Sequence, residues 1–284
     1  MTLRESTRSA PTIEARPASK GQLVYRQSVW TRVTHWLWAI SLFFLMTTGL
    51  QIFNAHPTLY VGSQSGFGFD NTVLEIGEVR QDGKVSGYTE IFGNRFDTTG
   101  VLGVSGTETR PVLKAFPEWA TIPSSRDLGT GRVIHLFFAW IFFFTLVTWL
   151  AASLVNGHLR DLIPSIRDLR HLPRDLLNHL RFRIHHTAGY NVLQKLTYAI
   201  VLFVLFPLMI ATGLTMSPAA NAIFPFLTEI FGGRQTARSL HFLFMVLLMG
   251  FFIVHIIMIF AAGPINELRS IITGWYKTSP GEGE

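Results

Sequence analysis

Four histidines in apolar surroundings are the residues of this chain best suited to chemistry. His35, His135, His241 and His255 each lie in or beside a long apolar stretch. An imidazole inside a membrane helix is costly unless it faces the bundle interior and finds a partner, so each one marks a candidate functional site. Because imidazole is also an axial ligand of haem iron, we interpret the four histidines as ligands of two stacked haems.

The spacing of two of these histidines supports this interpretation. His241 and His255 are 14 residues apart, so on a helix they return to nearly the same face, roughly 21 Å apart. One helix could therefore ligate two haems. Depth then predicts the pairs, with His135 and His241 near one membrane face and His35 and His255 near the other. Each pair would give a low-spin bis-imidazole iron with no open position, which carries electrons rather than binding oxygen.

Two further sequence patterns accompany the histidines. Arg32, Arg132 and Arg238 each precede a histidine by three residues, on roughly the same helix face, where a guanidinium could pair with a haem propionate. Alternatively, these arginines only snorkel to the interface from helix ends. The similar segments 45–50 (LMTTGL) and 209–214 (MIATGL) hint at a faint internal duplication. Their glycines could admit a porphyrin edge or serve close helix packing.

Composition indicates which elements must position these residues. The 284 residues include 24 Phe and 7 Trp, only 15% are charged, and the mean hydropathy is +0.32, which is typical of an integral membrane protein. We predict spans over about 30–53, 133–155, 192–214 and 240–262, each near the roughly 20 residues that crossing requires. The expected fold is an all-α membrane protein, a four-helix transmembrane bundle with a long external loop between helices 1 and 2.

Charge predicts the orientation of the bundle. The connection 156–190 holds Arg160, Arg167, Arg170, Arg174, Arg181 and Arg183, so it should be a cytoplasmic loop. Both termini then lie in the cytoplasm, and the external loop 54–131, in which acidic residues outnumber basic ones, faces outward. We expect a multi-pass protein of the bacterial inner (plasma) membrane. We also expect residues 1–24 to be a disordered cytoplasmic tail, 25–269 to be the membrane domain and 270–284 to be a second cytoplasmic tail.

Other features restrict the cofactors and partners. The chain has no cysteine, which excludes disulfides, Cys-ligated iron–sulfur clusters and the covalent attachment of c-type haem. The expected cofactors are therefore two haem b groups held without covalent bonds. The pI is about 9.9, and because the positive charge gathers on one membrane face, anionic lipid explains it without nucleic acid.

At these residues the chain resembles the di-haem cytochrome b subunits of nickel–iron hydrogenases, formate dehydrogenases (gamma subunit) and thiosulfate reductases. The resemblance covers roughly residues 25–269 and includes the four histidines with their 14-residue gap. A second match is Tyr190, Asn191, Gln194 and Lys195, which is similar to the Tyr-Asn-x-x-Gln-Lys segment of formate dehydrogenase gamma subunits.

The resemblance implies a quinone site on the cytoplasmic side. Asn191 would donate a hydrogen bond to a quinone carbonyl near the inner haem, with His255 on the far side of the pocket. His185 or His186 could relay protons there. The alternative is that Asn191 caps the third helix and that the two loop histidines are simply solvated, which is the interpretation we favour for those two.

The long external connection resembles the thiosulfate-reductase-like branch, in which the catalytic partner is often a periplasmic molybdenum enzyme. We therefore expect a membrane-anchoring subunit that transfers electrons between a periplasmic oxidoreductase and the membrane quinone pool of a respiratory chain. No independent substrate chemistry is expected, and the same ligands would serve either direction of electron flow. One alternative is a proton- or metal-coupled transporter, which the lack of Asp or Glu in the spans weakens. The other is a haem-free membrane anchor.

Overall fold

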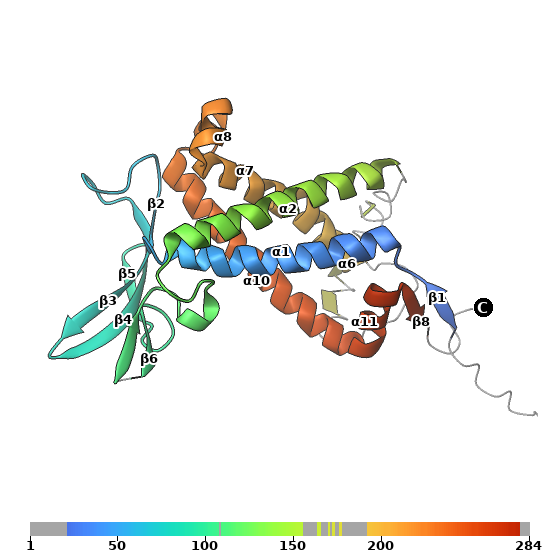
Figure 1. Ribbon diagram of the computed structural model, residues 1–284, viewed down its shortest axis with the longest axis horizontal. Helices are drawn as coiled ribbons and strands as arrows, with labels where there is room; N and C mark the ends of the chain where they lie inside the picture. Colours follow the sequence, from blue (N-terminus) through green and yellow to red (C-terminus); the bar gives the residue numbers. More distant parts are fainter. Residues whose placement is uncertain are drawn as a thin grey trace, which may run out of the picture.

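The computed structural model describes residues 22–107, 109–155 and 192–278, with a few isolated positions between 164 and 177. Four long apolar helical spans run along the molecule (Figure 1): α1 (Val29–Phe53), α2 (Leu128–Val155), a third from Val192 to Met216, and α10 (Arg234–Ala262). Their length and hydropathy are sufficient to cross a membrane. The four expected spans are confirmed, although α2 and α10 begin a few residues earlier than predicted.

The third span is one helix with a local irregularity. It consists of α6 (Val192–Ile200), the π-helical turn η2 (Val201–Leu205) and α7 (Phe206–Met216). Pro207 has no backbone N–H and so cannot make the usual bond to the preceding turn. The N–H of Phe206 instead donates to the carbonyl of Val201, five residues earlier. The proline therefore widens one turn without ending the helix.

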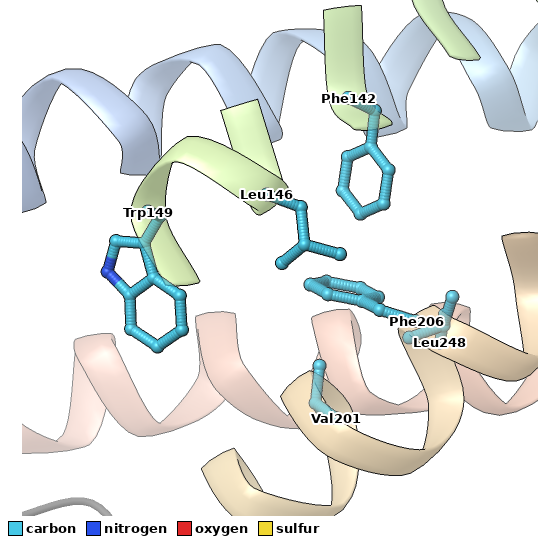
Figure 2. Close-up of a cluster of buried hydrophobic side chains, with 6 residues drawn as sticks. All are labelled: Phe142, Leu146, Trp149, Val201, Phe206 and Leu248. Carbon is cyan, nitrogen blue, oxygen red and sulfur yellow. The ribbon is translucent and has the colours of Figure 1, made fainter. Parts of the chain in front are cut away.

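An apolar cluster fills the middle of the bundle (Figure 2). Helices α1 and α2 pack together, as do α7 and α10, and Trp38 donates its indole N–H to Thr145 across the first pair at 3.1 Å. The buried side chains of the cluster come from α2, η2, α7 and α10: Phe142, Leu146, Trp149, Val201, Phe206 and Leu248. Leu248 is seven residues from both His241 and His255. The cluster therefore lies between the two levels at which the α10 histidines occur.

The connection between α1 and α2 contains a sheet, so the all-α expectation is wrong. β2 (Thr58–Tyr60), β3 (Thr72–Gln81), β4 (Lys84–Ile91) and β5 (Asn94–Asp97) form one antiparallel sheet in that order. A separate hairpin, β6 (Val104–Thr107) and β7 (Arg110–Leu113), and the short 3₁₀ helix η1 (Glu118–Ala120) follow.

Local turn chemistry explains these hairpins. The two-residue connections Asp82-Gly83 and Phe92-Gly93 join β3 to β4 and β4 to β5, and all four residues have positive φ, at 51° and 78° and at 47° and 76°. Positive φ at both central residues is the geometry of the type I′ turn, which matches the twist of the flanking strands. Asp-Gly between apolar runs is a hairpin signal that our sequence analysis overlooked.

The bundle has two distinct ends (Figure 1). The sheet and the short helices α8 (Pro218–Ile223) and α9 (Phe226–Ile230) lie at one end, which we call the sheet end. We call the other end the terminal end. There, helix α11 (Pro264–Thr273) is followed by β8 (Trp275–Lys277), which pairs antiparallel with β1 (Leu23–Tyr25). The expectation of disorder over 1–24 is therefore wrong for its last residues, which belong to β1, and part of the expected tail 270–284 is regular structure. Residues 1–21, most of 156–190 and 279–284 lie outside the described residues.

Candidate haem sites

Helix α10 contributes one histidine to each of two facing pairs. His135 of α2 and His241 of α10 lie toward the sheet end, with ring centroids 6.5 Å apart and ring planes at 60°. His35 of α1 and His255 of α10 lie toward the terminal end, also with centroids 6.5 Å apart and planes at 50°. The structure thus brings together the same pairs that depth predicts from the sequence.

The spacing within each pair fits a shared haem iron. Imidazole nitrogens bind metals at about 2 Å, so two rings on one iron have centroids roughly 6 Å apart. Both measured separations are 6.5 Å, and within the described residues no hydrogen bond joins the rings of either pair. In the described part of the chain, no three His, Cys, Asp or Glu side chains gather as metal ligands. A haem suits such two-ligand sites, because the porphyrin supplies the equatorial nitrogens and the protein only the axial ones.

The sheet-end pair has hydrogen-bonding partners on neighbouring helices. The hydroxyl of Thr48 lies 3.0 Å from Nδ1 of His135, and the hydroxyl of Thr212 lies 3.0 Å from Nδ1 of His241. Both threonines are fully buried. Neither threonine is among the site residues predicted from the sequence. The signal that could have found them is the similarity of segments 45–50 and 209–214, which places both threonines at the same position.

The terminal-end pair has different surroundings. Nδ1 of His35 is buried and has no hydrogen-bond partner within the described residues, while its ring meets Trp36 edge-on at 5.5 Å. The ring of His255 stacks on Phe251 at 5.7 Å with planes at 23°. Among the described residues, aromatic rings rather than hydroxyl groups therefore contact this pair.

The three arginines proposed to bind propionates lie at the ends of the helices. Arg32 donates at 2.7 Å to a backbone carbonyl near the end of α11, and its Nε is buried without a partner among the described residues. Arg132 is exposed in the first turns of α2. Arg238 donates to the carbonyl of Thr58 at 2.8 Å and to that of His56. These bonds tie the start of β2 to α10.

The expected quinone contact cannot be located in the structure. Asn191 lies outside the described residues, as do His185 and His186. The assignment of Asn191 therefore stays a prediction.

Comparisons with known proteins agree with a haem-binding bundle. A family model described as prokaryotic cytochrome b561 matches residues 26–274, a range that includes both histidine pairs and the sheet. Over 232 residues the chain is 25% identical to the putative protein-methionine-sulfoxide reductase subunit YedZ1 of Azospira oryzae, covering 81% of this chain and 87% of that protein. The chain therefore belongs to the prokaryotic cytochrome b561 family, the haem-binding electron-transfer proteins of bacterial membranes.

Proposed function

We propose that this chain is the membrane-anchoring di-haem b-type cytochrome subunit of a respiratory oxidoreductase complex. The observation that supports this best is the presence of two histidine pairs with the same 6.5 Å ring separation at the two ends of one bundle. His135 and His241 hold one haem b, and His35 and His255 hold the other. Held by two histidines, each haem would supply one-electron transfer and would not bind substrate.

The other residues of the bundle hold, separate and shield the two sites. Bound haem supplies a one-electron carrier at each end of the bundle. Helix α10 fixes the spacing, because a rise of 1.5 Å per residue separates its two histidines by roughly 21 Å. The apolar cluster around Leu248 excludes water between the two levels. The Nε of Arg32, which has no hydrogen-bond partner among the described residues, suits a propionate of the terminal-end haem. Arg132 and the remaining N–H groups of Arg238 suit those of the sheet-end haem.

The orientation follows from charge. The connection 156–190 is rich in arginine, whereas acidic residues outnumber basic ones in 54–131. The positive-inside rule then places both termini in the cytoplasm and the sheet end in the periplasm of a bacterial inner membrane. The sheet-end haem is therefore the one that faces a periplasmic partner.

The partner is a periplasmic oxidoreductase of the molybdenum-dependent class. Support comes from the resemblance of the long connection to the thiosulfate-reductase-like branch. It also comes from the similarity to a protein described as a subunit of a putative protein-methionine-sulfoxide reductase. The haems that His135 with His241 and His35 with His255 would hold would supply one-electron carriers between that partner and the membrane quinone pool. The same residues serve either direction of flow.

Electrons are exchanged with the membrane quinone pool at the terminal end, with Asn191 as the quinone contact. The test is anaerobic reduction of the haems by a short-chain quinol. Asn191→Ala should slow this reduction while the haem content and the dithionite-reduced spectrum stay unchanged. Equal rates in the variant and the wild type would remove Asn191 from the site.

The first experiment is a count of haems. The chain is purified in a mild detergent, and a dithionite-reduced minus oxidised spectrum is recorded together with haem b per polypeptide. The proposal requires two low-spin haem b groups per chain. One haem would overturn the di-haem assignment, and none in folded protein would overturn the proposal as a whole.

A further inference from the structure

The two ligands of the sheet-end haem have matched threonine partners on different helices. Thr48 of α1 contacts His135 of α2, and Thr212 of α7 contacts His241 of α10, with 3.0 Å between hydroxyl oxygen and Nδ1 in both cases. Each threonine is 0% exposed. The two helix pairs therefore use the same contact, once for each axial ligand.

The direction of these hydrogen bonds follows from the other bond that each hydroxyl makes. A threonine hydroxyl has one proton to donate but can also accept. Thr48 donates its proton to the carbonyl of Phe44 at 2.5 Å, and Thr212 donates to that of Leu208 at 2.7 Å. The hydroxyl oxygen must then accept a proton from the imidazole. Each ring consequently carries its proton on Nδ1 and keeps the lone pair of Nε2 free for a metal.

A glycine follows each threonine and lies against the same ring. A Cβ added at Gly49 would lie 3.5 Å from Cε1 of His135, and one added at Gly213 would lie 3.3 Å from Cε1 of His241. The first distance is an ordinary van der Waals contact, whereas at Gly213 the imidazole would have to shift by a few tenths of an ångström to admit a Cβ. The repeated Thr-Gly dipeptide therefore supplies both the acceptor for Nδ1–H and the space for the ring.

The arrangement is specific to one of the two sites. At the terminal-end pair, Nδ1 of His35 has no hydrogen-bond partner within the described residues. Among the four histidines, a threonine hydroxyl thus contacts only His135 and His241 within the described residues.

We propose that Thr48 and Thr212 are positioning residues for the sheet-end haem. They fix the tautomer and orientation of its axial ligands and lower its reduction potential. The physical reason is that a hydrogen bond donated by Nδ1–H, the ring nitrogen that does not bind iron, makes the ligating imidazole a better electron donor. A better donor favours the oxidised metal. This inference depends on the proposed ligation of one haem by His135 and His241.

The test is a redox titration of the full-length, haem-loaded chain with matched valine variants. Thr48→Val and Thr212→Val remove the hydroxyls that contact histidine. Thr47→Val and Thr215→Val are the controls, because these threonines are also buried on the same helices and donate to the carbonyls of Phe43 and Ala211 at 2.9 Å. We expect each of the first two variants to raise the midpoint potential of the sheet-end haem. We expect this rise in midpoint potential to be at most about 59 mV, which is a tenfold change in the reduced-to-oxidised ratio for one electron.

The other measurements in the same series separate positioning from general packing. The terminal-end haem and both controls should keep the wild-type potential. Thr48→Ser should restore it, because serine keeps the hydroxyl. If Thr48→Val does not fold, Thr48→Cys replaces it, since a thiol has similar size but accepts weakly. Thr48→Cys should then raise the midpoint potential of the sheet-end haem, whereas Thr47→Cys should leave it unchanged.

Two outcomes distinguish a failure of this inference from a failure of the proposed function. If the chain holds two haems and His241→Ala loses one, but Thr48→Val shifts the potential no more than Thr47→Val, the positioning role is wrong and the ligand assignment stands. If His241→Ala keeps both haems, the ligand assignment itself is wrong.

Discussion

Removing one histidine from α10 should remove one haem and leave the other in place. His241 and His255 are 14 residues apart on the same helix, roughly 21 Å along its axis, and the buried cluster that includes Leu248 lies between their levels. Neither site shares a ligand with the other. We therefore expect His241→Ala and His255→Ala each to reduce the haem content from two per chain to one, with a different haem remaining in each variant.

The remaining haem should also change its potential by a predictable amount. An oxidised haem carries one more positive charge than a reduced one, and this charge favours electron uptake at the other haem. Over roughly 21 Å, with an effective dielectric constant of about 20, the interaction is about 0.8 kcal/mol. For a one-electron couple this corresponds to roughly 35 mV. The haem that remains in His241→Ala should therefore have a midpoint potential lower than in the wild type by no more than about that amount.

The assay combines haem quantification with an optical redox titration of the wild type and both variants. His56→Ala is the matched control, because this exposed histidine stacks on Tyr60 outside the bundle, with ring centroids 5.7 Å apart, and should keep both haems. The reasoning is refuted if the two α10 variants retain haems with identical spectra and potentials. A shift of the remaining haem far above 35 mV would show that the sites are coupled through structure rather than charge.

Three further predictions concern a residue beside a haem ligand, the attachment of β2 to α10 and a tyrosine in the sheet. Gly213→Leu should weaken retention of the sheet-end haem by about 10–100-fold, because its Cβ would lie 3.3 Å from the ligand ring. Gly250→Leu is the control, because no atom lies within 4 Å of a Cβ added there, and equal haem retention in the two variants would contradict the expectation. Arg238→Met removes two charged hydrogen bonds to the backbone at the start of β2, each worth about 1.5–3 kcal/mol. Amide hydrogen exchange over residues 56–60 should therefore accelerate about tenfold or more, and an unchanged rate would show that these bonds do not stabilise the segment. Burial, together with a hydrogen bond to Glu75, raises the pKa of Tyr88 from 10 to about 12. The stability that Tyr88 contributes is therefore complete below pH 10 and is lost as the pH rises towards 12. Tyr88→Phe should remove this part of the pH dependence of thermal unfolding, and parallel curves of unfolding temperature against pH for the variant and the wild type would refute the expectation.

The sequence alone predicted the spans and the candidate ligands, because a bilayer constrains sequences strongly. Long apolar runs have few alternatives to helices in hydrocarbon, and buried imidazoles are rare enough to be noticed one by one. The 14-residue gap then placed His241 and His255 on one helix face, since helix geometry is fixed.

The sheet was missed although its signals are local. The turns at Asp82-Gly83 and Phe92-Gly93 have the geometry that two-residue hairpins require. The expectation of an all-α protein rested on the apolar spans, where lipid favours helices, but it does not apply to a connection that water can solvate. The signal for these strands lies in the chemistry of their turns, which is independent of hydropathy.

Only the tertiary structure decided which groups meet the histidines. Depth along a helix follows from residue number, but the rotation of one helix against another depends on the packing of all the side chains between them. Thr48 meets His135 across 87 residues of sequence, and Thr212 meets His241 across 29. The repeated Thr-Gly dipeptide is visible in the sequence, yet its contact with the proposed axial ligands exists only because α1 packs on α2 and α7 packs on α10.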